Sequence, residues 1–184
     1  PAPISGTSKD HVNLALNVPP ATGEDELIAS VMAEILSDGA LSALLGYLPH
    51  QGILSQREIM ARWLASFGMT TDIANLFITH GGQHALSIAL NMVAAPKDTV
   101  LTERFTYSGM IALSAQNGYR LHGVDGDEQG LLPEALSAAF AETGARVLFA
   151  TPSLQTPMGT VMGEKRRSMI AEVIERHQGY LLED

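Results

Sequence analysis

The sequence contains no cysteine, only one tryptophan and few basic side chains. Without cysteine there is neither a disulfide nor a catalytic thiolate, and a reducing compartment such as the cytoplasm is the expected location. The 11 lysines and arginines are outnumbered by 20 aspartates and glutamates, which argues against a nucleic-acid-binding surface within these residues. No apolar run approaches the length of a membrane span, and no signal-peptide pattern precedes the first helix. We therefore expect no membrane association.

What the chain has is an alternation of helical and strand patterns over 184 residues, 46% of them hydrophobic. Helices are predicted at residues 24–37, 83–94, 107–117, 133–142 and 163–177. Strands are predicted at residues 76–79, 99–102, 119–124, 146–150 and 179–183. Strands separated by helices predict an α/β fold with a mostly parallel sheet flanked by helices, whose ligand site lies in the loops at the carboxyl ends of the strands.

The two ends have the composition of an interrupted chain. Residues 1–22 begin with a polar, small-residue stretch and are predicted to be a linker and N-terminal arm, whereas residues 23–184 form a partial domain. The last predicted strand stops where a loop should begin, so we expect a longer protein on both sides. Within the domain, Ser55–Glu58 has the pattern of a capping box, and Gly68 ends that helix. Trp63 falls on the apolar spacing of the same helix and is predicted to be a core residue.

The stretch FITHGGQHAL, residues 77–86, combines a strand pattern, two glycines and the start of a helix. Such a turn is either a plain connector or a place where an anion meets the free N–H groups of the helix. His80 and His84 are separated by glycines and would not share a face, so a metal site is not predicted. The stretch also lacks the glycine spacing of a dinucleotide-binding loop.

Several stretches together resemble the fold type I enzymes that depend on pyridoxal phosphate (PLP). They occur in the family's order at residues 47–52 (YLPHQG), 79–86 (THGGQHAL), 99–109 (TVLTERFTYSG), 151–159 (TPSLQTPMG) and 182–184 (LED). Among these enzymes and their relatives, the first, second and fourth stretches are most similar to MocR-type regulators of the GntR superfamily. Those regulators join a winged helix-turn-helix domain through a linker to an aminotransferase-like domain.

The resemblance implies a cofactor site built from Tyr47, Gly81, Gly82, Gln83, Tyr107, Gln155, Thr156 and Asp184. It implies that the glycine turn and Gln83 bind the phosphate, that Tyr107 stacks on the pyridine ring, and that Asp184 faces the ring nitrogen. Tyr47 would reach the phosphate bound by a neighbouring subunit. Simpler interpretations stay open: Tyr107 as a core aromatic, Gln155 as a polar turn residue, Tyr47 as a buried tyrosine, and Asp184 as a strand terminator.

The sequence departs from the family pattern in two respects. Thr156 stands where the family has the asparagine that contacts the 3′-oxygen of the cofactor, and threonine is shorter. The lysine that forms the Schiff base is expected outside this chain, because Lys9, Lys97 and Lys165 lie in a linker, a turn and a helix start. We therefore predict no catalytic residue here and no transamination by this chain alone.

Three hypotheses follow. The first is the PLP-binding effector domain of a MocR-type regulator, a homodimer that responds to an amino-acid-like molecule and contacts DNA only through a winged helix elsewhere in the protein. The second is part of a free-standing class I/II aminotransferase, acting on an amino acid and a 2-oxo acid. The third is an α/β binding module that has lost the cofactor.

Overall fold

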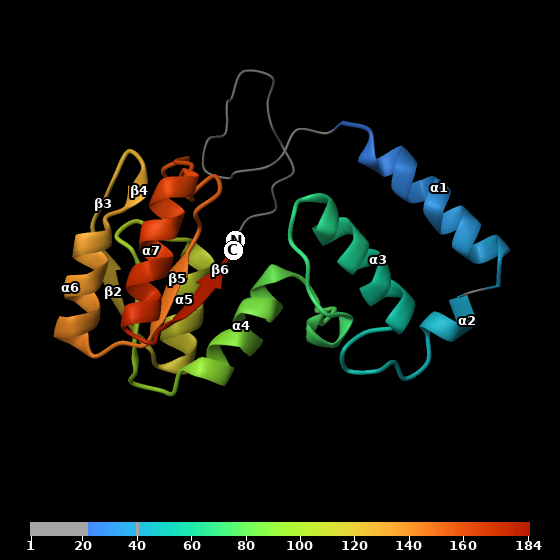
Figure 1. The fold of residues 1–184 in the computed structure, drawn as a ribbon. Coiled ribbons are helices and arrows are strands. Elements are labelled where there is room, and N and C mark those ends of the chain that lie inside the picture. The colour runs from blue at the N-terminus through green and yellow to red at the C-terminus, as the bar shows by residue number, and fades with distance from the viewer. Residues whose placement is uncertain (1–21, 40) are drawn as a thin grey trace, which may run out of the picture. The chain divides into compact units, whose positions relative to one another are not determined.

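The computed structural model describes residues 22–39 and 41–184, and the chain divides into two compact units between His50 and Gln51 (Figure 1). The first unit contains the helices α1 (Glu24–Ser37) and α2 (Leu41–Leu44). The first turn of α1 is acidic, which suits the positive end of the helix dipole, and none of its described residues is buried. The helix expected at 24–37 is confirmed. The linker expected at 1–22 lies outside the described residues except for its last residue.

The second unit begins with α3 (Leu54–Ser66), and the capping box expected at Ser55–Glu58 is wrong. The N-cap is Ile53, whose carbonyl oxygen accepts a hydrogen bond from the Arg57 amide at 3.1 Å. Ser55 therefore lies inside the first turn and cannot cap it. The end of the helix is as expected, because Gly68 follows the C-cap with a φ of +83°, a left-handed conformation that suits glycine.

Two further expectations for this region are wrong. Trp63 is 54% exposed, and its ring meets that of Phe67 edge-to-face at 5.0 Å. Within the second unit, Leu54, Ile59 and Trp63 of α3 all stay exposed. The strand expected at 76–79 is irregular backbone after the short helix η1 (Ile73–Asn75). Its Ile78 amide bonds to the Gln51 carbonyl oxygen at 2.9 Å, but no strand within residues 22–39 and 41–184 pairs with it. An extended segment becomes a strand only when a neighbouring strand completes its ladder.

From residue 82 onward the helices and the longer strands alternate as predicted, each within two residues of its expected bounds, whereas a short hairpin at residues 126–131 was not predicted. The helices are α4 (Gly82–Val93), α5 (Ser108–Asn117), α6 (Pro133–Thr143) and α7 (Glu164–Arg176). The strands are β1 (Thr99–Glu103), β2 (Arg120–Val124), β5 (Val147–Ala150) and β6 (Tyr180–Glu183), with a small hairpin of β3 (Gly126–Asp127) and β4 (Gly130–Leu131). The four longer strands form a parallel sheet in the order β2-β1-β5-β6.

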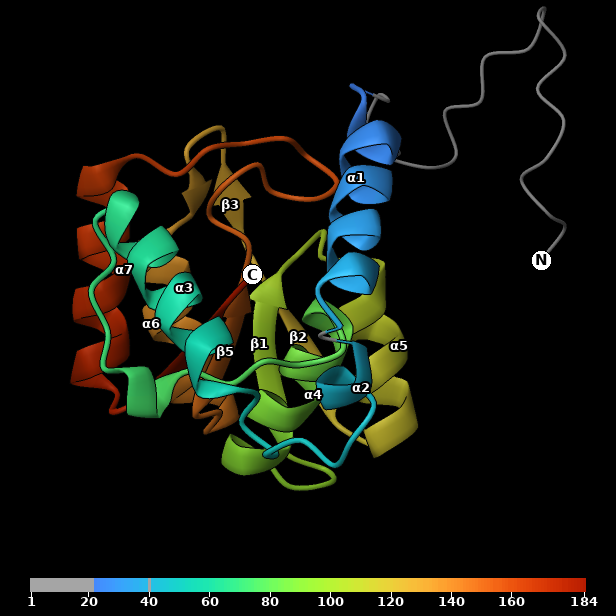
Figure 2. The same ribbon diagram turned by 90° about the vertical axis from the view of Figure 1, so that its right-hand side faces the viewer.

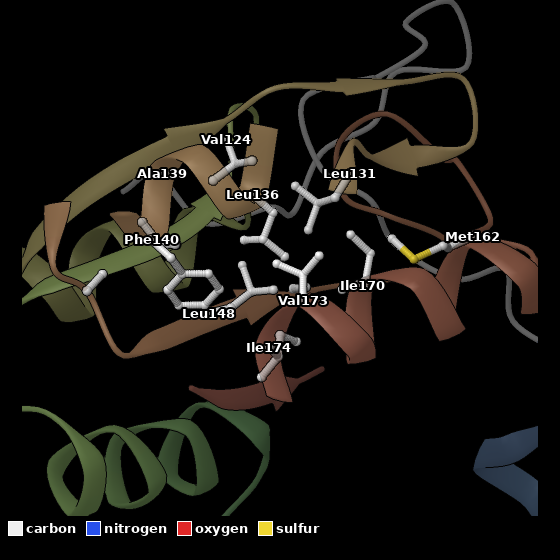
Figure 3. Packing of buried hydrophobic residues seen from close by; sticks show 13 residues of the cluster. Val124, Leu131, Leu136, Ala139, Phe140, Leu148, Met162, Ile170, Val173 and Ile174 are labelled. Carbon is white, nitrogen blue, oxygen red and sulfur yellow. The ribbon is translucent and has the colours of Figure 1, made fainter. Parts of the chain in front are cut away.

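Helices cover both faces of this sheet, and each face has its own hydrophobic cluster (Figures 1 and 2). On one face α6 and α7 lie side by side, and Phe140, Ile170 and Val173 pack against Leu101 and Leu148 of the strands (Figure 3). On the other face α4 and α5 pack on alternate residues of the same strands, which are Val100, Val147, Phe149 and Leu182. The α/β fold with a parallel sheet flanked by helices is thus confirmed. It brings the carboxyl ends of β1, β5 and β6 to one edge.

Candidate functional site: the turn before helix α4 and the end of strand β6

The glycine turn places the N-terminus of α4 at the carboxyl edge of the sheet. Gly81 is the N-cap and has a φ of +93°, a conformation that other residues rarely adopt. The first N–H groups of an α-helix have no partner inside the helix, and Gly81 has no side chain with which to bond them. Gly81, Gly82 and Gln83 are exposed. The turn therefore presents unpaired N–H donors and the positive end of the α4 dipole, which together suit an anion.

Asp184 lies opposite this turn. Its amide donates to the Ala150 carbonyl oxygen at 3.1 Å, which extends the pairing of β6 with β5 by one residue. A Cβ atom added to Gly82 would lie 3.9 Å from Oδ1 of Asp184. The preceding Glu183 points to the other face, where its Oε1 meets Nη1 of Arg167 at 3.1 Å. Asp184 is therefore the carboxylate on the α4 face, and it is exposed there, as the alternation along the strand predicts.

Gln83 and Tyr107 meet at the start of α5. The Gln83 side-chain amide donates from Nε2 to the Gly109 carbonyl oxygen at 3.0 Å. A Cβ atom on Gly109 would collide with the Tyr107 ring and with Oε1 of Gln83, so only glycine fits between them. The Tyr107 ring is half-buried and packs against the cluster between the sheet and α4 and α5. The structure thus brings together Gly81, Gly82, Gln83, Tyr107 and Asp184.

Gln155 and Thr156 lie in the loop after β5, and the structure separates their roles. Gln155 is 5% exposed, and its amide is engaged at both ends: Nε2 donates to the Phe105 carbonyl oxygen at 2.5 Å, and Oε1 accepts from the Met158 amide at 2.8 Å. These bonds fix the loop and leave Gln155 no free polar end. Thr156 is exposed beside it, with its hydroxyl available as a donor.

Tyr47 is fully exposed and belongs to the first unit, after α2. The alternative that it is a buried tyrosine is therefore wrong for the described chain. A contact between Tyr47 and the phosphate of a neighbouring subunit stays a prediction.

His80 and His84 are closer than the sequence suggested. Their rings stack with centroids 5.5 Å apart, and the His80 amide donates to Nδ1 of His84 at 3.2 Å. The expectation that they would not share a face is wrong, because the glycine turn folds the residue before it back over the first turn of α4. Across residues 22–39 and 41–184, no group of three or more His, Cys, Asp or Glu residues could hold a metal ion.

Glu103 is the residue that sequence reasoning missed. It ends β1, is 8% exposed, and its Oε1 accepts from the Thr151 amide at 3.0 Å, while Oε2 is buried without a hydrogen-bond partner. Burial raises the pKa of the Glu103 carboxyl, and the bond donated by the Thr151 amide acts in the opposite direction. The signal that could have found it is a carboxylate at the end of a buried strand, TVLTE.

The chemical groups on the α4 face match those that PLP requires of its binding site. The cofactor combines a phosphate, a flat aromatic ring and a ring nitrogen that is protonated when a carboxylate lies beside it. The α4 face offers a helix N-terminus with a glycine cradle, a tyrosine ring and the exposed Asp184 carboxylate. None of the helices in the described part of the chain is long and apolar enough to cross a membrane.

Comparisons with known proteins agree with this geometry. The 184-residue chain is 29% identical over 139 residues to the HTH-type transcriptional regulator YdfD of Bacillus subtilis, covering 76% of this chain and 29% of the regulator. It is 37% identical over 114 residues to the aminotransferase swnA of Metarhizium robertsii, covering 58% of this chain and 23% of swnA. The chain thus spans less than a third of the length of either relative.

Among solved structures, the kynurenine aminotransferase of Pyrococcus horikoshii, in complex with PMP, superposes with a TM-score of 0.78 and 28% identity. That match covers 87% of this chain and 41% of the enzyme. The model of the family "Aminotransferase class I and II" matches residues 9–184. The chain therefore belongs to the class I and II aminotransferase family.

Proposed function

We propose that this chain is the PLP-binding part of the effector domain of a MocR-type transcriptional regulator. The observation that carries the proposal is the facing pair formed by the α4 N-terminus at Gly82 and the Asp184 carboxylate. The similarity to an HTH-type regulator over most of the chain supports a regulatory role. In the whole protein, a winged helix N-terminal to this chain would contact DNA. The net charge of −9 fits a domain that does not itself bind nucleic acid.

Different residues of the chain would bind different parts of the cofactor. The N–H groups at the start of α4 would bind the phosphate, and the Gln83 amide would exchange its bond to Gly109 for one to a phosphate oxygen. The Tyr107 ring would stack on the pyridine ring, and Asp184 would hold a proton on the ring nitrogen. The Thr156 hydroxyl would donate to the 3′-oxygen. When bound, PLP supplies an aldehyde that condenses with primary amines.

The chain would recognise an effector without completing a reaction. Neither Lys97, in the turn before β1, nor Lys165, in the first turn of α7, lies on the α4 face at the carboxyl edge of the sheet. The lysine that forms the Schiff base would come from another part of the protein. An amino-acid-like effector would compete with that lysine for the cofactor. The change would reach the DNA-binding module through a cytoplasmic homodimer in which Tyr47 contacts the partner's phosphate.

A free-standing aminotransferase is the second candidate. The observation that favours it is the similarity to swnA and to the solved aminotransferase, both of which are named as enzymes. Turnover of an amino acid and a 2-oxo acid by the full-length protein, together with no binding to DNA upstream of its own gene in a mobility-shift assay, would select this candidate.

The cofactor assignment is tested by Gly82→Val in the full-length protein. A side chain at Gly82 meets nothing closer than Asp184 Oδ1, so the fold tolerates it, but it would occupy the space of the phosphate. We expect loss of the visible absorbance of bound PLP with an unchanged circular dichroism spectrum. Gly163→Val is the matched control, because Gly163 likewise lies at a helix start, as the N-cap of α7, and its Cβ atom would meet nothing within 4 Å. Normal PLP uptake by Gly82→Val would show that the turn only connects two elements and does not bind the phosphate.

A further inference from the structure

A cavity of about 540 Å³ opens beside the carboxyl end of β1. Its apolar walls are the side chains of Phe105, Val124, Leu131 and Met158. Its polar lining includes four acidic residues and one arginine, which are Glu103, Asp125, Asp127, Glu128 and Arg104. A cavity of this size accommodates a small organic molecule.

This cavity opens on the opposite face of the sheet from Gly82 and Asp184, and the loop that carries Thr156 borders it at Gln155 and Met158. Side chains alternate along β1, so that Val100 packs in the cluster under α4 and α5 while Leu101 packs in the cluster under α6 and α7. Glu103 is two residues after Leu101, so its side chain points to the same face, that of α6 and α7. Val124 and Leu131, which line the cavity, belong to that same cluster. Asp184 and Gly82 face each other on the other side.

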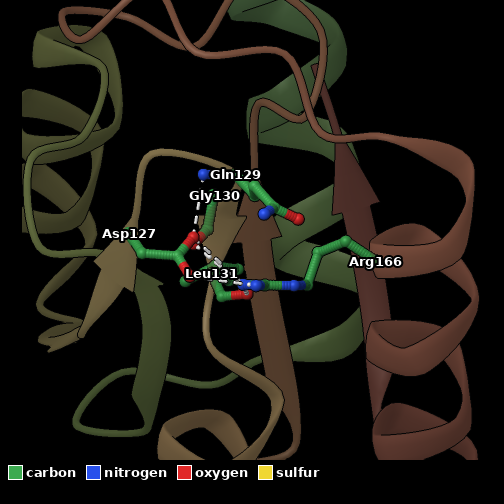
Figure 4. A network of polar contacts seen from close by, with 5 residues as sticks. All are labelled: Asp127, Gln129, Gly130, Leu131 and Arg166. Atoms are coloured by element: carbon green, nitrogen blue, oxygen red, sulfur yellow. Dashed lines mark hydrogen bonds and ion pairs between the residues drawn. The ribbon is translucent and has the colours of Figure 1, made fainter.

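The hairpin that forms one wall is held in place by Arg166 of α7 (Figure 4). Nη2 of Arg166 meets Oδ2 of Asp127 at 2.9 Å, and Nη1 donates to the Leu131 carbonyl oxygen at 2.7 Å. At the rim, Arg104 is paired with Asp125 at 2.5 Å, so both basic groups beside the cavity are already bound to carboxylates. The wall is therefore preformed, and the remaining charge on it is negative.

Glu103 supplies the one buried polar atom without a partner in this lining. Its Oε1 is fixed by the Thr151 amide at 3.0 Å, whereas Oε2 has no hydrogen-bond partner. A buried carboxylate oxygen without a partner is unfavourable, and a cation or hydrogen-bond donor that reached it would remove that cost. Gln155 also lines the cavity, but both ends of its amide are engaged by Phe105 and Met158. Glu103 is therefore the residue of the lining that can bind a polar group of a ligand.

We propose that this cavity binds a small organic amine, whose ammonium group pairs with Glu103 and whose apolar body packs against Phe105, Val124, Leu131 and Met158. This site lies across the sheet from the pair formed by Gly82 and Asp184, and the proposal holds whether or not the chain acts on DNA. An anionic ligand is disfavoured, because Arg104 and Arg166 are already paired with Asp125 and Asp127, which leaves Glu103 and Glu128 as the uncompensated charges of the lining.

The test uses the full-length protein with PLP bound and N,N-dimethyl-2-phenylethylamine as the probe. This amine is tertiary, so it has no N–H with which to condense with the PLP aldehyde, and binding reports on the cavity alone. Affinity is measured by isothermal titration calorimetry, with 3-phenylpropionate as the probe of matched shape and opposite charge. We expect saturable binding of the amine and at least about tenfold weaker binding of the acid.

Two variants and a matched control locate the binding. Glu103→Gln keeps an acceptor for the Thr151 amide but removes the charge, and it should weaken amine binding at least about tenfold. Met158→Trp should fill the mouth of the cavity and weaken binding without disturbing the core, since Met158 is 59% exposed. Met92→Trp on α4, where the methionine is 79% exposed, is the control and should bind as the wild type does.

Three results would overturn the proposal: no saturable amine binding by the wild type, equal affinity for the acid, or wild-type affinity in both Glu103→Gln and Met158→Trp. If Glu103→Gln does not fold, Met158→Trp decides alone.

Discussion

At the scale of single residues, two opposing effects act on the ionisation of the Glu103 carboxyl. The side chain ends a buried strand, where an ionised carboxylate is costly, yet the Thr151 amide donates to it and so favours the ionised form. Burial is the larger of these influences and raises the pKa of Glu103. In the folded protein the proton is therefore held more tightly than in the unfolded chain, whose glutamates titrate near 4.5. Folding stability must then depend on pH at this residue.

Glu103→Gln should remove that dependence. Below about pH 4.5 Glu103 is neutral in both states, so the variant and the wild type should have similar free energies of unfolding. As the pH rises through the raised pKa, the wild type loses stability because the buried group must ionise, and the variant should become the more stable of the two. Chemical denaturation across this pH range measures the difference. A difference that stays constant with pH would contradict the prediction.

Asp184→Asn tests the carboxylate that faces the helix start. In the full-length protein, PLP should stay anchored through its phosphate, while its absorbance spectrum and the pH dependence of that spectrum shift, because the ring nitrogen loses the charge that holds its proton. We expect PLP affinity to fall about tenfold, roughly 1.4 kcal/mol. Glu183→Gln is the control, since Glu183 points to α7. A spectrum and an affinity that both match the wild type would remove Asp184 from the site.

At the scale of elements, the loop from β5 to α7 depends on Arg167. Its Nη2 donates to the Ser153 hydroxyl at 2.8 Å, its Nε donates to the Met162 carbonyl oxygen at 2.9 Å, and its Nη1 meets Glu183 at 3.1 Å. One side chain of α7 thus ties both ends of the loop that carries Gln155 and Thr156 to the end of β6. Because the bonds converge on a planar guanidinium, lysine could not replace them.

Arg167→Ala should therefore loosen this loop and leave the sheet intact. We expect a loss of roughly 1–2 kcal/mol in the free energy of unfolding, as for several partly exposed hydrogen bonds. Faster amide exchange should be confined to residues 153–162. Lys165→Ala, an exposed residue two positions earlier in the same helix, is the matched control. Amide exchange that is equally fast in both variants would show that the loop is held by Gln155 alone.

The sequence could predict the helices and the longer strands from α4 to β6, because each had its own apolar period and a clear stop, whereas the two-residue strands β3 and β4 are too short to show a period. Gly118 and Gly144, for example, end α5 and α6 in left-handed conformations. Strand 76–79 and the burial of Trp63 failed because both depend on a partner layer that no local pattern encodes. The same holds within the site. Gly82 and Asp184 stand at element ends and could be placed together, whereas the orientation of Gln155 and the burial of Glu103 depend on contacts about 50 residues away in sequence.

At the scale of the whole molecule, large apolar side chains on helices α1 and α3 remain exposed. On α1 they recur at helical spacing, and on α3 they include the ring of Trp63; the set is Leu27, Ile28, Val31, Met32, Leu36, Leu54, Ile59 and Trp63. Apolar patches of this kind usually mark surfaces that another chain or segment covers. The proposed homodimer would provide such cover.

We therefore expect the 184-residue chain to self-associate in sedimentation velocity experiments at roughly tens of micromolar. Replacing Ile28 and Met32 together by lysine should shift the distribution toward the monomer, because the two residues lie one turn apart on the same face of α1. The control is Met92→Lys on α4, an exposed methionine on the other unit. A strictly monomeric wild-type chain would rule out this role for α1.

The order of strands in the sheet also determines when the molecule can fold during synthesis. β1 emerges first and pairs with β2 across α5, but its other edge is completed only by β5, through pairs such as Val100 with Val147. At roughly 5–20 residues per second, the ribosome needs a few seconds to add the residues between β2 and β5. During that interval the edge of a nascent β1, with its unpaired N–H and C=O groups, is open to chaperones or to neighbouring chains. Slow codons are therefore least tolerable between residues 125 and 150.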